Sequence, residues 1–568
     1  MKTTSMEQSC NSDAPKEGLT TDACLYSKAS DLLRDRPAVI TLFITLAVLT
    51  LFHLRYLPTK LAHYTDPVIY LSGAESLAKG EGYRFAAHAG SPRIGCQPPL
   101  QAAYLSLFWR LHPQFPQNVW LLYAGLVLCI LATFILFYFL CCKNGLPPLM
   151  AGLTILAWGL SLQWNTLLYG LMSDILFGLL GLILATYWLG TNAASASRRW
   201  FVTGILVALM YLSRTAAVAV MGVLGLVVAF RGWKTRKFGP LVAYLIPIVP
   251  TVFLWKFWTG GTPGYADYMR FRIAEEGSWQ KVFEYNLSSA MDYLSGLGFV
   301  QCLFGSFVNL SAHPGVSNTT LSPILTALTL VFCWAFTGFW LVGCWRAKMA
   351  NERVLALVVA AYLVHLCLYP ANLSERCLYA ILPFVVIWAW KGFSALPWKV
   401  LEIRLVRYGL LLSLGLIIVG NAVDSVRGAR FLDSSGHQKE LNEVGSWLRA
   451  NSPPETVVAA TLSEPLMHFY HASGRKVVEN YFQAKPWFSV AAHSTNNAVK
   501  ADYVLLYWYS TLSTNDLSCE LQLAKASSQG RFRLYRVISD SRAGTKPAFA
   551  AAGLEETKTP QDRLKTAP

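Results

Sequence analysis

The chain has 568 residues, of which 54% are hydrophobic and only 14% are charged. A soluble globular protein carries about 25% charged residues, so this composition excludes an ordinary soluble protein and indicates that apolar surface is buried in lipid. The formal net charge of +16 does not indicate nucleic-acid binding, because the Lys and Arg residues stand in short clusters between apolar runs. The 12 cysteines are scattered and form no C-x-x-C pair, so they indicate neither a disulfide framework nor a zinc site.

The chain begins with a polar stretch, residues 1–36, which we expect to be a disordered cytoplasmic tail rather than a cleavable signal peptide. The first apolar run, from Ala38 to Leu54, is just long enough to cross a hydrocarbon core of about 30 Å. Ten more apolar runs follow, so the sequence predicts about eleven transmembrane helices within residues 37–422. They are expected at 118–140, 147–166, 172–190, 200–213, 215–230, 239–257, 321–345, 352–370, 377–392 and 405–422.

The distribution of basic residues predicts the orientation of these helices. With the N-terminus in the cytoplasm, nearly every basic cluster beside a span falls on the cytoplasmic side, as the positive-inside rule requires. The same alternation places loops 55–117 and 258–320, and everything after residue 423, outside the cytoplasm. We therefore expect a multi-pass protein, in a bacterial inner (plasma) membrane.

The character of the chain changes after residue 423. Helical spacing of apolar residues predicts helices over 437–450 and 463–473. Runs rich in β-branched and aromatic residues predict strands over 456–461, 476–478, 503–509 and 532–537. Residues 423–540 should form a small extracytoplasmic α/β domain, and residues 541–568 a disordered tail.

A polar stretch follows about ten residues beyond the first apolar run and contains Asp66, followed by Pro67. Asp is a favoured N-cap and Pro a favoured first helical residue, which predicts a short surface helix over residues 67–79, closed by Gly80. A second interfacial helix is expected over residues 98–110, with an aromatic stripe that packs or faces lipid. Asp66 can cap the first helix, hold a substrate hydroxyl, or do both.

Residues 66–100 resemble the first loop of GT-C glycosyltransferases. The resemblance rests on Asp66, on Tyr70 four residues later, on the turn Gly80-Glu81-Gly82-Tyr83, and on Pro98-Pro99-Leu100. It is to the branch that contains protein O-mannosyltransferases, lipid A aminoarabinose transferases and RgtA/B/C/D-like enzymes. Three later stretches agree with it: Ser173-Asp174-Ile175-Leu176-Phe177, Leu212-Ser213-Arg214, and Glu375-Arg376-x-x-Tyr379-x-x-x-Pro383.

The resemblance implies an integral membrane enzyme that takes a sugar from a polyprenyl-phosphate donor and passes it, with inversion, to a lipid, glycan or protein acceptor. It implies that Asp66 is the catalytic base. Arg214 and Arg376 are candidates for binding the donor phosphate, since a guanidinium suits a phosphate by its bidentate geometry, although an Arg at a membrane boundary can instead reach lipid phosphates. The remaining candidates for substrate binding are Asp174, Tyr379, Tyr70 and Gln97, with Arg270 and Arg272 weaker.

Two departures from the family pattern bear on the acceptor. Pro67 stands where many members have Glu, and Gln97 stands where aminoarabinose transferases have Lys; the second difference argues against lipid A as the acceptor. No cofactor is indicated, and a metal site is not indicated either, although Asp66 and Asp174 together remain a possible pair of ligands for a divalent ion.

Two other functions stay open at this point. A transporter or flippase of lipid-linked sugars would share the long apolar body, but transporters usually have internal repeats with broken helices at mid-membrane. A membrane scaffold without activity would need none of the acidic and basic candidates.

Overall fold

The computed structural model describes residues 35–57, 65–95, 97–190, 196–260, 273, 277–294, 321–347, 350–368, 375–395, 404–434, 437–460, 466–479, 501–507, 519–529 and 532–540. The predicted tails up to residue 34 and from 541, together with Arg270 and Arg272, lie outside the described residues.

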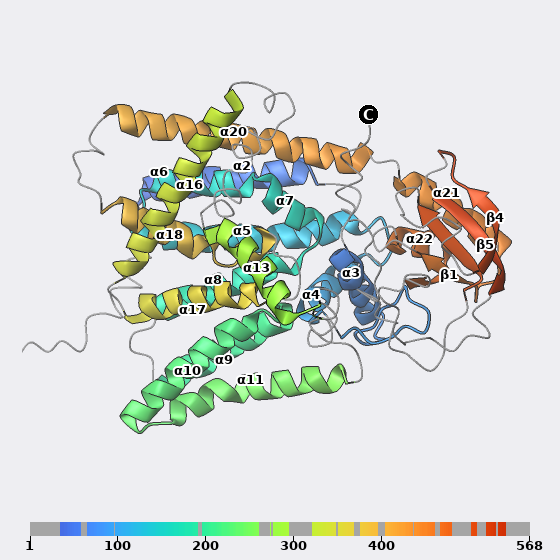
Figure 1. Ribbon diagram of the computed structural model, residues 1–568, viewed down its shortest axis with the longest axis horizontal. Helices are drawn as coiled ribbons and strands as arrows, with labels where there is room; N and C mark the ends of the chain where they lie inside the picture. The colour runs from blue at the N-terminus through green and yellow to red at the C-terminus, as the bar shows by residue number, and fades with distance from the viewer. Residues whose placement is uncertain are drawn as a thin grey trace, which may run out of the picture.

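Most of the described chain is helical, and the apolar runs expected from the sequence are built largely of helices that pack side by side into one bundle (Figure 1). The two short helices α3 (Thr65–Ala78) and α4 (Leu100–Leu111) lie between this bundle and a C-terminal sheet. The helices up to residue 434 are α2 (Arg36–Arg55), α3 (Thr65–Ala78), α4 (Leu100–Leu111), α5 (Val119–Lys143), α6 (Pro148–Gly159), α7 (Leu162–Tyr169), α8 (Ser173–Gly190), α9 (Ala196–Ser213), α10 (Ala217–Thr235), α11 (Gly239–Trp258), α13 (Trp279–Leu294), α16 (Leu321–Trp345), α17 (Ala350–Cys367), the 3-10 turn η1 (Glu375–Leu378), α18 (Leu382–Phe393) and α20 (Arg404–Ser434).

Five of the described helices are long and apolar enough to cross a membrane, or six if the bent pair α7–α8 forms one span. The count of eleven transmembrane helices therefore stays a prediction. The structure shows why the lengths of single helices do not give the number of spans. The run at 147–166 is divided into α6 and α7, and the run at 377–392 begins with the turn η1 before α18. Two of the predicted spans are thus composed of shorter pieces.

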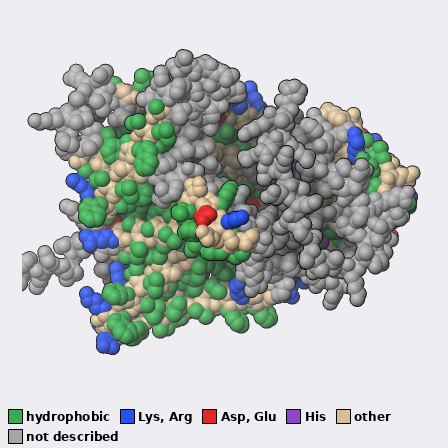
Figure 2. Space-filling model, viewed as in Figure 1, with side chains coloured by type: hydrophobic (Ala, Val, Ile, Leu, Met, Phe, Trp, Pro, Cys, Tyr) green, Lys and Arg blue, Asp and Glu red, His purple; other side chains and the backbone are tan. Residues whose placement is uncertain are grey.

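The lipid-facing character of the bundle is visible on its surface. Figure 2 shows hydrophobic side chains covering the exposed face of the bundle, with Lys and Arg side chains gathered at the end farthest from the sheet. Leu226 and Phe257, for example, are 73% and 75% exposed, which is costly in water and favourable in lipid. The chain is accordingly an integral membrane protein.

The C-terminal part of the chain, residues 437–540, forms a five-stranded sheet with two helices, which we call the C-terminal α/β unit. The strands lie in the order β2-β1-β3-β5-β4; β1 runs parallel to β2 and β3, and β5 runs antiparallel to β3 and β4. Four predicted strands are confirmed, and β4 is a fifth that the sequence did not predict. The elements are α21 (His437–Asn451), β1 (Val457–Ala460), α22 (Leu466–Ser473), β2 (Lys476–Glu479), β3 (Tyr503–Tyr507), β4 (Cys519–Ala526) and β5 (Phe532–Asp540).

The C-terminal α/β unit is joined to the bundle by the segment between α3 and α4. The backbone N–H of Val477, on the edge strand β2, donates to the carbonyl of Ala87, and the N–H of Ala89 donates to the carbonyl of Val477. His88 is therefore paired with the sheet edge by a parallel bridge. One hydrophobic cluster also runs from the bundle into the unit, so the two parts share a core.

Candidate functional site

The helix α3 lies at the junction between the bundle and the C-terminal α/β unit (Figure 1) and carries Asp66 in its first turn. The sequence predicted Asp66 as the N-cap, whereas the helix begins one residue earlier, at Thr65. The carboxylate is used in tertiary contacts: Arg376 Nη1 donates to Oδ2 at 2.9 Å, and Gln97 Nε2 lies 3.5 Å from Oδ1. The side chains of Asp66 and Arg376 are 20% and 35% exposed, so the pair remains accessible from outside the protein.

The glycine-rich turn after α3 explains how Gln97 reaches Asp66. Gly80 and Gly82 have φ angles of +80° and +83°, which suit glycine. The chain then turns back and lays the ring of Tyr83 against Gly73, where an added Cβ would come within 2.4 Å of the ring. The hydroxyl of Tyr83 donates to the carbonyl of Gln97 at 3.1 Å. The Gly-x-Gly-Tyr motif therefore supports the residue that contacts the Asp66 carboxylate.

A sharp break between α7 and α8 forms another wall of the site. The chain bends by 111° between the two helices, and Leu171 at the bend has a φ of +47°. The buried side chain of Gln101 holds this turn by donating from Nε2 to the carbonyl of Leu171 at 2.9 Å. The next residue, Met172, places its sulfur 3.6 Å from Arg376 Nη1. Sequence reasoning missed Gln101 and Met172; the Gly170 beside the break was the available signal.

A second ion pair lies beside the first. Arg214, at the end of α9, pairs with Asp174 in the first turn of α8, and their side chains are only 13% and 5% exposed. Ser173, the neighbour of Asp174, is hydrogen-bonded through its Oγ to the hydroxyl of Tyr70 at 2.9 Å. Of the predicted site residues, Asp66, Tyr70, Gln97, Asp174, Arg214 and Arg376 therefore converge where α3, α8, α9 and η1 meet.

The electrostatics of Arg376 tie the two pairs together. Burial by itself lowers the pKa of an arginine, but the negative charges of Asp66 and Asp174 outweigh that effect, so the pKa of Arg376 is raised above its ordinary value. The Arg214 charge acts in the opposite direction. Arg376 is thus held as a cation between two carboxylates.

Tyr379 occupies a different environment from the other predicted residues. It is 2% exposed, and its ring stacks on Trp158 at 6.2 Å between centroids and packs on Trp164 at 5.1 Å. This aromatic cluster fixes the backbone that follows Arg376. The structure therefore places Tyr379 in the core behind the site.

Each of the two carboxylates has an arginine partner in this structure, and the described residues contain no group of three His, Cys, Asp or Glu side chains arranged for a metal ion. Asp66 and Asp174 as a pair of metal ligands would have to leave these arginines.

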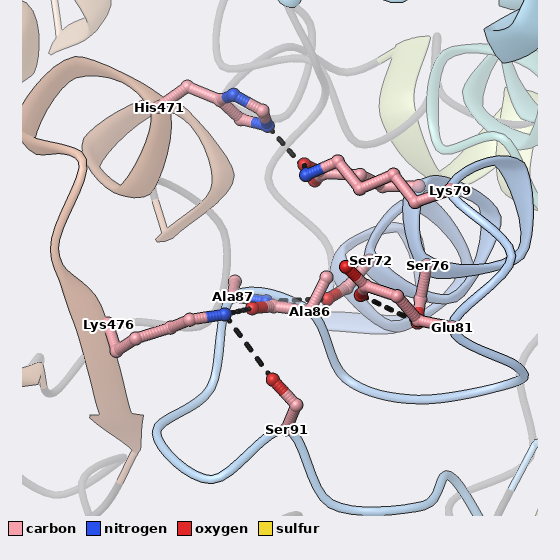
Figure 3. Close-up of polar contacts among 10 residues, drawn as sticks. Ser72, Ser76, Lys79, Glu81, Ala86, Ala87, Ser91, His471 and Lys476 are labelled. Carbon is pink, nitrogen blue, oxygen red and sulfur yellow. Dashed lines mark hydrogen bonds and ion pairs between the residues drawn. The ribbon is translucent and has the colours of Figure 1, made fainter.

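The other end of α3 carries a second carboxylate in a different setting. Glu75 is 2% exposed; it accepts from Lys79 Nζ at 2.7 Å and is paired with His471 Nε2 at 3.1 Å. Figure 3 labels its two partners, Lys79 and His471. Burial acts to raise the pKa of Glu75, but hydrogen bonds and charge from His471 and Lys79 outweigh it and lower that pKa. Nearby, Lys476 donates to the carbonyl of Ala86. The end of α3 opposite Asp66 is therefore anchored on the C-terminal α/β unit.

Comparison with solved structures identifies the fold. The structure of ArnT from Cupriavidus metallidurans bound to undecaprenyl phosphate matches with a TM-score of 0.56 at 11% sequence identity, over 89% of this chain and 99% of that one. The apo structure of the same protein matches with a TM-score of 0.54, with the same identity and coverage. No protein-family model and no curated protein matches the sequence. The GT-C fold expected from the sequence is thus confirmed.

Proposed function

We propose that the protein is an inverting membrane glycosyltransferase that moves a sugar from a polyprenyl-phosphate donor to a hydroxyl group of an acceptor outside the cytoplasm. The observation that carries the proposal is the contact of Asp66 with Arg376 at the accessible end of the bundle, with the Asp174–Arg214 pair beside it. The GT-C fold and the polyprenyl phosphate bound by ArnT support the choice of donor.

The chemistry assigned to the site has three parts. The carboxylate of Asp66 takes the proton from the acceptor hydroxyl as its oxygen attacks the anomeric carbon. The bond between that carbon and the phosphate oxygen breaks, and the polyprenyl phosphate leaves with the electron pair. Arg376 stabilises the negative charge that develops on the phosphate. In this single displacement the acceptor oxygen attacks the anomeric carbon from the side opposite the phosphate, so the configuration inverts.

The proposed orientation follows from the basic side chains. Lys and Arg gather at the end of the bundle remote from α3 (Figure 2), and Arg231, Lys234 and Arg236 flank the turn between α10 and α11 there. By the positive-inside rule this end is cytoplasmic, so the site and the C-terminal α/β unit face outward. Reporter fusions at about residue 445 test this orientation; a cytoplasmic reporter signal would contradict it.

The activity itself is tested with purified protein and a panel of polyprenyl-phosphate sugars, by scoring the release of free polyprenyl phosphate. Release of lipid phosphate from one member of the panel is expected, with acceptor-dependent stimulation. A transporter, which can also contain a broken helix such as α7–α8, would move the donor across a vesicle membrane and leave it intact. Movement of the donor across the membrane without release of polyprenyl phosphate would therefore contradict the proposed enzyme and indicate a transporter.

A further inference from the structure

In the described part of the chain, the guanidinium of Arg376 makes few contacts with protein acceptors. An arginine has five N–H donors. Within the described part of the chain, only Nη1 contacts protein acceptors, namely Asp66 Oδ2 at 2.9 Å and the sulfur of Met172 at 3.6 Å. With 35% of its side chain exposed, Arg376 can also be reached by an anion that enters the site. A phosphate that binds with two parallel hydrogen bonds through Nη1 and Nη2 has to take Nη1 from Asp66.

The two ion pairs differ in how easily they can open. Asp174 and Arg214 are 5% and 13% exposed, and breaking a buried pair leaves an uncompensated charge. Asp66 and Arg376 are 20% and 35% exposed, and partly solvated pairs are held by little free energy. An incoming anion therefore exchanges with Asp66 more readily than with Asp174.

The contacts of Asp66 also bear on its proposed role as the base. Its Oδ2 accepts from Arg376, and its Oδ1 faces Gln97 Nε2 at 3.5 Å. A general base needs an oxygen within about 2.6–3.2 Å of the hydroxyl whose proton it takes. Release of Oδ2 from Arg376 frees that oxygen to accept from the hydroxyl.

We propose that Asp66 occupies Arg376 in place of the donor phosphate in the resting protein, and that the phosphate displaces it. The displaced carboxylate is then free to face the acceptor hydroxyl, so donor binding precedes and enables deprotonation of the acceptor. This inference rests on the proposed function. It assigns one arginine to two successive anions, and donor binding frees Oδ2 of Asp66 for the acceptor hydroxyl.

The test is the affinity of the full-length protein, in lipid nanodiscs, for undecaprenyl phosphate as the probe. Asp66→Asn removes the competing charge and leaves the size of the side chain unchanged. Opening a partly exposed pair corresponds to a gain in affinity of about fivefold, so Asp66→Asn should bind the probe about fivefold more tightly than the wild type. The gain should disappear in the double variant Asp66→Asn with Arg376→Gln.

Glu81→Gln is the matched control, because Glu81 is an exposed carboxylate in the turn after α3 and its change removes the same charge without touching Arg376. An equal gain in Glu81→Gln would attribute the effect to net charge and overturn the displacement. Unchanged or weaker binding by Asp66→Asn, together with loss of transfer, would overturn the displacement and leave Asp66 as the base. Full transfer by Asp66→Asn would instead overturn the proposed function of Asp66.

Discussion

The two ends of α3 present the same chemical group in opposite settings. At the N-terminal end, Asp66 is 20% exposed and meets Arg376 at the surface of the bundle. At the C-terminal end, Glu75 is 2% exposed and is paired with Lys79 and His471. Both carboxylates contact residues more than 300 positions away in the chain, so both organise tertiary structure. The difference in exposure separates a carboxylate available to a ligand from one committed to packing.

The largest expected effect is that of Asp66→Asn on transfer. The substitution removes the base and keeps the shape, so the rate should fall by roughly 10²–10⁴. The loss of a negative charge in the first turn of α3 should cost only about 0.3–1 kcal/mol of helix stability. Release of polyprenyl phosphate and a thermal unfolding curve measure the two quantities. A fully active Asp66→Asn protein would show that the carboxylate of Asp66, like that of Glu75, is not needed for catalysis.

Substitution of Arg376 should produce the next largest effect. Arg376→Ala loses charged hydrogen bonds to the phosphate, each worth about 1.5–3 kcal/mol, and kcat/KM should fall by about 10–100-fold. Arg376→Lys keeps the charge without the bidentate geometry and should be less impaired. Initial rates at varied donor concentration separate the variants. Near-normal kcat/KM in both would make Arg376 a structural partner of Asp66 alone.

Glu75→Gln should show the reverse pattern from Asp66→Asn. The neutral amide leaves Lys79 and His471 without their carboxylate, and the protein should lose about 1–3 kcal/mol of stability. The kcat of the folded fraction should stay near that of the wild type, because Glu75 lies at the far end of the helix from Asp66. Thermal unfolding and active-site titration provide the measurements, with Glu81→Gln as the exposed control. Loss of transfer in a stable Glu75→Gln protein would contradict the assignment.

The smallest effect expected is the pH dependence of the Glu75 contact. Since folding lowers the pKa of Glu75 from its ordinary 4.5, its contribution is complete above that value and is lost as the pH falls through the lower folded pKa. The stability difference between wild type and Glu75→Gln should therefore shrink as the pH falls below 4.5. Unfolding midpoints at several pH values give this difference. A difference that persists unchanged in acid would exclude ionised Glu75 as its cause.

The sequence predicted which residues form the site better than which of them contact each other. Short motifs identified Asp66, Asp174, Arg214 and Arg376 because charged residues beside apolar runs are conspicuous in a membrane protein. Which carboxylate meets which arginine depends on helix packing across 310 residues for Asp66 and Arg376, and no local pattern carries that information. The aromatic environment of Tyr379 was hidden for the same reason.

In the fold, periodic apolar runs indicated the helices reliably, whereas their interruptions were less visible. The break at Leu171 depends on a backbone turn held by Gln101 from another helix. The strand β4 was missed because its sequence, Cys519–Ala526, mixes two leucines with charged and small residues. The pairing of Val477 with Ala87 was inaccessible to local reasoning, since it joins separate parts of the chain.

The pairing of the segment 86–91 with β2 has a consequence for the order in which the protein is made. Lys476 and its acceptor Ala86 are 390 residues apart, which at 5–20 residues per second corresponds to roughly 20–80 s of synthesis. During that interval, the segment after α3 has no sheet edge to join, and the anchor of Glu75 on His471 does not exist. The arrangement around α3 is therefore completed only after the last helix of the bundle has been synthesised, so a truncated chain released before β2 would contain Asp66 without its finished support.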